Sequence, residues 1–566
     1  MSLTVDQEQT VESSYQESGQ PVHQSGPASV SNFFLKTWPL LVLSLVTLLA
    51  RLLTAPGIIE SRDGLFFTRG LDRYSVLEMR PHWPGYPVYI WAGYFFKLFT
   101  DNNAQALHLV AIFASTLTLW PVAGLAAGWR RYVTPDPSEA EVRLAGFAAA
   151  ALWALVPLSW QGGTEIFSDP LAMLLAVTML WLCWQAVTKS TGVTAYLAVA
   201  AVLAGLTLGV RLSYVALLLP LFFATWLNRK QNGKLNFKLL WITGISFFFS
   251  IGMWLDWQFI QEGSKFIEAG TRHLAGHYSE WGGSITTDHN ELTRPVRFFE
   301  TGLVYGLGGW WTDTPWQRLP LTLMLLVLLV ASGIRLVTAR YSLYDLPLFR
   351  RNSPAGQPVK SASLLKALCS TSRLPLVLSL LWSVPYFFWI LLGNDVDLAR
   401  YCFPLVAIAC IWIGMGLPRG KKLATVTLLV LLIAEAVVSV PLGIEHHTSL
   451  PITHRLANYM NQYLDPATST VVVGDALSPL MFFTEENAPK IPSERVLDVN
   501  MTGEVAKLEA QGKTVYGTYL PNTAPQGWQP VIRLCRSRFM ESRGPLEVWL
   551  YRHAPGAAPA PLPGCY

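Results

Sequence analysis

The sequence predicts a polytopic α-helical membrane protein that ends in a small α/β domain. Of its 566 residues, 51% are hydrophobic and only 14% are charged, whereas soluble domains have about 25% charged residues. Apolar segments of about 17–25 residues, the length that crosses a hydrocarbon core, recur along most of the chain. The 22 Trp and 20 Tyr fit this class, because aromatic rings favour the membrane interface. The small net charge of +5 gives no reason to expect nucleic-acid binding.

Residues 1–33 are rich in Gln, Ser and Glu and predict a disordered cytoplasmic tail, without the basic region of a cleaved signal peptide. Residues 34–445 then predict a transmembrane domain of about eleven helices. The predicted spans are 37–53, 107–129, 144–160, 170–187, 195–210, 213–227, 239–259, 319–337, 374–392, 401–417 and 423–442. Segment 88–99 is too short to cross and predicts a helix at the membrane surface.

Basic residues in the short loops predict the orientation, because they collect on the cytoplasmic side. If the N-terminus is cytoplasmic, the basic clusters on its side are those at residues 36, 130–143, 189, 228–238, 340–373 and 418–422. The extracytoplasmic side then holds the loops 55–105 and 260–318 and the C-terminal residues 446–566. The arginines of the first of these loops break the rule, which suggests an anionic ligand.

Residues 446–566 predict a small extracytoplasmic α/β domain. Strand-like runs such as STVVVGDA alternate there with the helical pattern GEVAKLEAQGK. Cys535 and Cys565 fall in this domain and either pair as a disulfide or stay free. Cys183, Cys402 and Cys410 fall within predicted spans and are expected to be packing residues.

Four short motifs follow one another along the chain. ESRDGLFF contains Asp63, PHWPGYPVYIW contains His82 and Tyr86, IFSDPLAM contains Asp169, and ARYCFPL contains Arg400 and Tyr401. In this order and spacing, between residues 38 and 442, they resemble motifs of the GT-C superfamily of membrane glycosyltransferases. The resemblance is greatest to the branch that holds the protein O-mannosyltransferases and the aminoarabinose–lipid A transferases.

The chain also departs from the pattern of that branch. Gly64 follows Asp63 where the branch usually has a second acidic residue. HWPGYPVYI stands where the branch has a Pro-Pro-Leu-Tyr-Tyr run, although Trp91 is kept. These departures leave the substrate subfamily open.

The resemblance implies a glycosyltransferase with a GT-C-like bundle. Such an enzyme moves a sugar from a polyprenyl-phosphate carrier to an extracytoplasmic lipid, glycan or protein, with inversion at the anomeric carbon. The expected partners are the lipid-linked donor, the acceptor and the membrane lipids. Family members differ in metal dependence, so no cofactor is expected and a divalent metal stays open. The absence of a KDEL-type retention signal favours a bacterial inner (cell) membrane.

The chemistry of sugar transfer assigns roles to the motif residues. A carboxylate must take the proton of the attacking acceptor hydroxyl, and Asp63 is the candidate general base. The departing phosphate needs positive charge and hydrogen-bond donors rather than a strong acid. The candidates for substrate binding are Glu60, Arg62, His82, Tyr86, Arg211, Arg400 and Tyr401. Asp169 is the second catalytic candidate, for acceptor or metal binding or for a role shared with Asp63.

Each assignment has a structural alternative. Asp63 can simply cap or solvate a loop, and a solvated surface position is the favoured alternative for Glu60. Asp169 stands in SDP, which has the chemistry of a helix N-cap followed by proline. Arg211 can snorkel to lipid headgroups, and Arg400 can be an ordinary interfacial anchor together with its tyrosine neighbour.

The loop 260–318 contains His273 and His277, four residues apart, followed by Asp288 and His289. These residues match no recognised metal-ligand spacing. A flexible lid over the site is therefore favoured over a metal centre.

A transporter or flippase of a lipid-linked substrate is the alternative function. Such a protein should place ionisable residues near the bilayer midplane. Here the charges gather at one edge, with Glu435 as the exception. A non-catalytic scaffold is the third class, and it leaves the ordered motifs unexplained.

Overall fold

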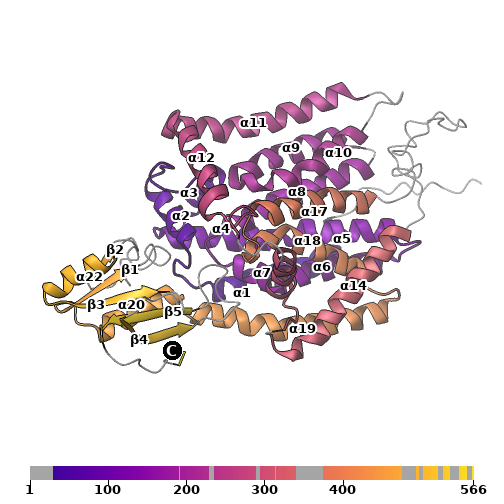
Figure 1. Cartoon of the computed structure of the whole chain (residues 1–566). Coiled ribbons are helices and arrows are strands. Elements are labelled where there is room, and N and C mark those ends of the chain that lie inside the picture. Colours follow the sequence, from indigo (N-terminus) through magenta and orange to yellow (C-terminus); the bar gives the residue numbers. More distant parts are fainter. Residues whose placement is uncertain are drawn as a thin grey trace, which may run out of the picture.

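The computed structural model describes most of the bundle and parts of the C-terminal domain. The described residues are 30–189, 191–228, 235–288, 293–312, 314–338, 374–473, 493–495, 501–519, 527–535, 547–556 and 564–565. Most of the predicted tail 1–33, the loop 340–373 and His289 lie outside these ranges. Within them, a helical bundle leads through one long helix into a small sheet domain (Figure 1).

The first half of the bundle alternates long helices with short ones. It comprises α1 (Val30–Thr54), α2 (Arg62–Asp72), α3 (Pro87–Phe96), α4 (Asn103–Leu117), α5 (Leu119–Val133), α6 (Glu139–Leu155), α7 (Pro157–Gly162), α8 (Asp169–Thr188), α9 (Val193–Val210), the 3-10 helix η1 (Leu212–Leu218) and α10 (Leu219–Leu227). The predicted loop 55–105 therefore contains two helices, α2 and α3.

The second half begins with the long helix α11 and ends with α19. It comprises α11 (Phe237–Glu262), α12 (Lys265–Gly276), η2 (His277–Trp281), α13 (Arg294–Glu300), η4 (Thr301–Gly306), η5 (Trp316–Arg318), α14 (Leu319–Thr338), α17 (Leu374–Gly393), η7 (Ala399–Cys402), α18 (Phe403–Gly416) and α19 (Lys421–Thr448). The segment 260–318, predicted as a long loop, is thus helical over much of its described length.

Nine helices in the described ranges are long and apolar enough to cross a membrane. The other two predicted spans are also helical but are interrupted. Segment 144–160 divides at Val156 into α6 and α7, because the residue before a proline disfavours helical backbone. Segment 213–227 is formed by η1 and α10, which together cover Leu212–Leu227. The prediction of a polytopic helical bundle is confirmed, and the protein is a multi-pass membrane protein.

The helices differ in how deeply they lie inside the bundle. The apolar windows of Asn103–Val133 and Ala399–Gly416 are 72% buried, and that of Asp169–Thr188 is 56% buried. By contrast, the windows of Thr37–Thr54, Phe237–Glu262 and Lys421–Thr448 are 11%, 22% and 28% buried. The central helices are therefore α4 with α5, α8 and α18. The candidate residues Asp169 and Arg400 lie at the beginnings of two of these central segments.

The C-terminal domain contains α20 (Ile452–Tyr463), β1 (Ser469–Val473), β2 (Ser493–Arg495), α22 (Met501–Ala510), β3 (Thr514–Tyr519), β4 (Trp528–Cys535) and β5 (Glu547–His553). The strand order is β2-β1-β3-β5-β4, with β1 parallel to β2 and β3 and with β5 antiparallel to β3 and β4. Helices α20 and α22 contribute to separate apolar clusters against this sheet. The predicted α/β domain is confirmed, and α19 continues to Thr448, beyond residue 445 where the bundle was expected to end.

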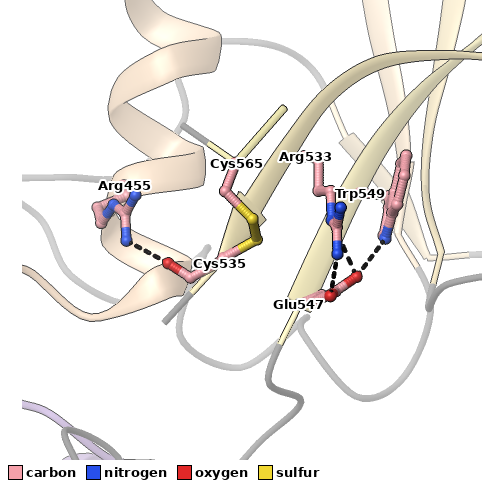
Figure 2. The surroundings of a disulfide bond; sticks show 6 residues. All are labelled: Arg455, Arg533, Cys535, Glu547, Trp549 and Cys565. Carbon is pink, nitrogen blue, oxygen red and sulfur yellow. Dashed lines mark hydrogen bonds and ion pairs between the residues drawn. A yellow bond between two sulfur atoms is a disulfide. The ribbon is translucent and has the colours of Figure 1, made fainter. Parts of the chain in front are cut away.

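A disulfide joins Cys535, the last residue of β4, to Cys565 near the end of the chain (Figure 2). The Cα atoms are 5.4 Å apart, and 30 residues separate the two cysteines. On α20, Arg455 donates a hydrogen bond of 2.7 Å to the Cys535 carbonyl oxygen, and Arg533 and Glu547 form an ion pair across β4 and β5. The paired alternative for these cysteines is confirmed. The three predicted packing cysteines are buried and free.

Candidate active site

Helix α2 places Asp63 at the edge of the bundle. Its N-cap is Ser61, whose hydroxyl oxygen accepts a hydrogen bond of 3.1 Å from the Gly64 amide. Asp63 therefore lies in the first turn, where the helix dipole favours a negative charge. The alternative that Asp63 is a solvated loop residue is wrong, because it is a helical residue whose side chain is only 18% exposed.

Asp63 forms an ion pair with Arg400, which comes from η7 just before α18. The Arg400 Nη1 atom lies 3.0 Å from Asp63 Oδ2, and His82 Nε2 lies 3.9 Å from the same oxygen. Burial favours the neutral carboxyl. The attraction of His82, which is charged only in the acidic range where Asp63 titrates, and of Arg400, Arg211 and Arg62 outweighs burial and lowers the pKa of Asp63. The carboxylate is consequently ionised at neutral pH.

His82 and Tyr86 come from the turn between α2 and α3. His82 Nε2 lies 3.0 Å from the Tyr86 hydroxyl oxygen. Burial is the main cause that lowers the pKa of His82 to about 4, with Asp63 opposing it. His82 is therefore neutral at pH 7, and it would contact a phosphate as a hydrogen-bond donor rather than as a cation.

Gly85 fixes the backbone of this turn. Its φ is +88°, and a Cβ atom there would overlap the Tyr74 hydroxyl and the Gln258 amide. Gln258 on α11 donates hydrogen bonds of 2.6 Å to the Pro84 carbonyl oxygen and of 2.9 Å to the Tyr74 hydroxyl. The close approach that glycine permits thus joins the His82 turn to α11.

Asp169 and Arg211 form a second, deeper ion pair. Asp169 is fully buried at the first position of α8, and its Oδ2 lies 2.6 Å from Arg211 Nη1. Ser168 occupies the N-cap position of α8, and no side-chain capping bond forms there among the described residues, so the N-cap alternative for Asp169 is wrong. The snorkelling alternative for Arg211 is also wrong, because that side chain is only 7% exposed.

Tyr401 connects the two ion pairs. Its ring centroid lies 5.1 Å from the Arg400 guanidinium carbon and 5.6 Å from that of Arg211, within the range of cation–π contacts. The structure therefore brings together seven of the nine predicted site residues, namely Asp63, His82, Tyr86, Asp169, Arg211, Arg400 and Tyr401.

Glu60 and Arg62 do not join this cluster directly. Arg62 is exposed, and its guanidinium lies 5.4 Å from the Phe66 ring centroid. Glu60 precedes the N-cap of α2 and lies 3.7 Å from His108 on α4, a residue that no motif identified. Glu60 is therefore an interior residue of another cluster rather than a solvated one.

Helix α12 lies beside the candidate site. The ring of His273 stacks on His82 with centroids 6.1 Å apart and lies 5.6 Å from the Trp83 ring. His277 Nε2 lies 2.8 Å from the Gly393 carbonyl oxygen, so it donates a hydrogen bond there. Among the described residues, no group of three His, Cys, Asp or Glu side chains is arranged to hold a metal ion.

A family model described as the N-terminal domain of the protein O-mannosyl-transferase TMEM260 matches residues 75–235. No curated protein sequence matches the chain.

Three solved membrane glycosyltransferases are similar in structure. ArnT from Cupriavidus metallidurans, bound to undecaprenyl phosphate, has 10% identity, a TM-score of 0.49, and coverage of 93% of this chain and 100% of that chain. The archaeal oligosaccharyltransferase AglB from Archaeoglobus fulgidus, in complex with an inhibitory peptide and a dolichol-phosphate, has 12% identity, a TM-score of 0.42, and coverage of 86% and 70%. The arabinofuranosyltransferase AftD from Mycobacteria has 16% identity, a TM-score of 0.36, and coverage of 92% and 40%.

The matched range 75–235 contains His82, Tyr86, Asp169 and Arg211 but neither Asp63 nor Arg400. The predicted resemblance to the protein O-mannosyltransferase branch of the membrane glycosyltransferases is confirmed, and over this range the chain is similar to the TMEM260 family of protein O-mannosyltransferases.

Proposed function

We propose that this chain is an integral-membrane glycosyltransferase that moves a sugar from a polyprenyl-phosphate carrier to a hydroxyl of an extracytoplasmic lipid, glycan or protein. The observation that carries the proposal is the ion pair formed by Asp63 of α2 and Arg400 of η7, 3.0 Å apart. It combines an ionised carboxylate for the acceptor hydroxyl with a guanidinium for the carrier phosphate.

In the proposed reaction, Asp63 takes the acceptor proton as the acceptor oxygen attacks the anomeric carbon. The bond between that carbon and the carrier phosphate breaks, and the phosphate leaves with its electron pair. Arg400 and Arg211 compensate the negative charge that develops on it. An incoming phosphate competes with Asp63 for Arg400, which leaves the carboxylate more basic when the donor is bound. The anomeric configuration is inverted, because a single displacement takes place.

Neutral donors complete the proposed phosphate site. Burial raises the pKa of the Tyr86 hydroxyl, so it keeps its proton at neutral pH and can donate a hydrogen bond. His82 is neutral and can donate through one ring nitrogen. The Tyr401 ring contacts the guanidinium groups of both Arg211 and Arg400. Arg62, on the exposed side of α2, adds positive charge near Asp63.

Asp169 is proposed to bind a substrate hydroxyl while it orients Arg211. Its Oδ2 is engaged by Arg211, whereas its Oδ1 accepts no hydrogen bond from another described residue. A buried acceptor oxygen without a partner is costly, and a sugar hydroxyl would satisfy it. This assignment uses the carboxylate for acceptor or donor binding and makes no use of a metal ion.

The orientation proposed here places the N-terminus in the cytoplasm and the C-terminal domain outside it, in a bacterial inner membrane. Helices α2, α3 and α12 gather at the end of the bundle from which α19 leads into the C-terminal domain (Figure 1). The Cys535–Cys565 disulfide supports this orientation, because disulfides persist in oxidising compartments. The proposed partners are the lipid-linked donor, the acceptor and the surrounding lipids.

The test uses the purified protein with a panel of polyprenyl-phosphate sugars and a crude membrane-lipid extract as the source of acceptor. The release of free polyprenyl phosphate is followed for the native chain, for Asp63→Asn and for Asp72→Asn. Asp72 is the matched control, because it lies exposed at the other end of α2 and contacts Asn103. The proposal expects a loss of at least about 100-fold in Asp63→Asn only.

Two other outcomes distinguish the alternatives. Unchanged turnover in Asp63→Asn would keep the enzyme class and move the general base elsewhere, with Asp169 as the next candidate. No turnover with any donor, together with no binding of the carrier lipid, would contradict the proposal. That result would favour a transporter, in which buried Glu435 of α19 would be the first residue to substitute.

A further inference from the structure

A buried histidine outside all four motifs contacts two backbone carbonyl groups. His108 lies in α4 and is only 3% exposed. Its Nδ1 atom lies 2.7 Å from the Thr164 carbonyl oxygen, and its Nε2 atom lies 3.1 Å from the Ile58 carbonyl oxygen. A carbonyl oxygen can only accept, so each ring nitrogen must donate. A neutral imidazole carries one N–H group, whereas the imidazolium ion carries two.

Glu60 provides the countercharge for such an imidazolium. Its Oε1 atom lies 3.7 Å from His108 Nε2, and the two side chains are 8% and 4% exposed. A charge buried to this degree is costly unless it is paired. Besides His108, the backbone amides of Glu60 and Ile166 approach the Glu60 carboxylate and favour its ionised form.

The two carbonyl groups bear on whether Glu60 or His108 carries the proton of this pair. Burial and then the neighbouring Glu165 raise the pKa of Glu60, whereas the amides of Glu60 and Ile166 lower it. The proton could therefore lie on Glu60 or on His108. If it lay on Glu60, the neutral ring would turn a lone pair toward one of the two carbonyl oxygens at 2.7 or 3.1 Å. That repulsion favours the imidazolium, whereas burial of the ring disfavours the charged form, so the contacts with the two carbonyl groups and with Glu60 have to outweigh the burial.

The two carbonyl groups belong to the segments that carry the candidate carboxylates. Ile58 lies five residues before Asp63, and Thr164 lies five residues before Asp169. One ring on the central helix α4 thus contacts both segments at equivalent distances along the chain. The ring therefore links the backbone of the two segments.

Other titratable groups surround the pair. Glu165 precedes α8, and its Oε1 lies 3.7 Å from Nε2 of His446, which comes from α19. The buried Tyr89 hydroxyl of α3 lies in the electric field of both Glu60 and Asp169. His108 and His446 also act on each other electrostatically.

We propose that His108 is a positioning residue, a buried imidazolium balanced by Glu60 that fixes the distance between the segments carrying Asp63 and Asp169. This role replaces the substrate-binding role predicted for Glu60. The inference rests on the proposed function only where turnover is the readout.

The protonation state is measured directly by ¹⁵N NMR on histidine-labelled protein in lipid nanodiscs. The His108 ring signals are assigned as those lost in His108→Gln, or as those that move in Glu60→Gln if the first variant does not fold. The expected result at pH 7 is protonation of both ring nitrogens. A ring with one protonated and one bare nitrogen would overturn the proposal.

The positioning role is measured by hydrogen exchange and by the pH profile of turnover. Glu60→Gln removes the countercharge, so the ring should lose its proton about one to three pH units lower. Amide exchange in segments 56–63 and 163–169 should then rise together between pH 6 and pH 8. Turnover should fall about tenfold over that range, while the native chain and the control Glu78→Gln should not change.

Glu78 is a suitable control because it lies exposed between α2 and α3, in an ion pair with Arg73. Parallel profiles for Glu60→Gln and Glu78→Gln would overturn the positioning role. If no variant and no native protein shows turnover, the proposed function fails. The NMR and exchange results would still decide the role of His108.

Discussion

Replacing Arg211 with glutamine should destabilise the protein strongly, and replacing Asp169 as well should add less than the loss that Asp169→Asn causes alone. Asp169 is fully buried, and its Oδ2 lies 2.6 Å from Arg211 Nη1. Arg211→Gln leaves a carboxylate without its partner inside the bundle, and Asp169→Asn leaves a guanidinium in the same position. Removing one partner of a buried pair costs about 3–5 kcal/mol.

The expected coupling can be worked from the geometry. At an effective dielectric constant of about 20, two unit charges about 3–4 Å apart attract each other by about 4–6 kcal/mol. Desolvation of both groups offsets part of that attraction. The coupling free energy between Asp169 and Arg211 should therefore be about 2–4 kcal/mol. The double variant, with two neutral amides, should be more stable than the sum of the single losses allows.

The assay is a double-mutant cycle with the free energy of unfolding in detergent measured for all four proteins. The control cycle uses Glu268 and Arg272 on α12, an ion pair whose side chains are 62% and 79% exposed. That exposed pair should show a coupling of about 0.5 kcal/mol or less. Additive losses for Asp169 and Arg211 would refute the argument that their charges depend on each other.

Three further changes have expected outcomes. The pKa of His82 is lowered from 6.5 to about 4. Between these pH values the His82 side chain is protonated in the unfolded chain and neutral in the folded chain. Stability should fall by about 3 kcal/mol as the pH drops from 6.5 to 4 and level off below, and His82→Gln should remove that slope in unfolding measurements. Gly85→Ala should cost more than about 1 kcal/mol and lower turnover, whereas Gly244→Ala, where a Cβ atom meets nothing within 4 Å, should do neither in the same assays. Cys535→Ser, like Cys565→Ser, should destabilise the C-terminal domain by about 3–4 kcal/mol, seen as faster proteolysis after residue 449.

Each of these predictions has a contradicting result. An unchanged pH slope in His82→Gln would mean that another group binds the proton. A native-like Gly85→Ala variant would show that the turn can relax away from the α11 side chains. Equal proteolysis of the native chain with and without reductant would show that the disulfide does not stabilise the domain.

The sequence was sufficient to predict the bundle and much of the site. Apolar length alone located all eleven predicted helical segments, because a hydrocarbon core sets the length of a span. The four motifs identified most of the residues of the candidate site. Seven predicted residues lie together in the structure, among them Asp63, Asp169 and Arg400.

The pairing within the site was beyond the sequence pattern. Asp63 and Arg400 are 337 residues apart, and Asp169 and Arg211 are 42 apart. Only packing of the central helices decides which carboxylate faces which guanidinium. Local signals were available for α2, because Ser61 followed by Asp63 is typical of a helix N-terminus. The sequence therefore already supported a helix where a loop was predicted.

Glu60 and His108 show a different limit. A lone histidine within an apolar helix has no spacing pattern that distinguishes a buried cation from a packing residue. The carbonyl groups of Ile58 and Thr164 define its role, and backbone contacts of this kind leave no pattern in the sequence.

The central claim is tested most directly by measuring donor binding and turnover separately in Asp63→Asn. The dissociation constant of the polyprenyl-phosphate sugar and the single-turnover rate are measured for the variant and the native protein. Loss of a general base predicts a rate at least about 100-fold lower, with donor binding changed less than about tenfold. A variant rate within about threefold of the native rate would contradict the assignment of Asp63 as the base.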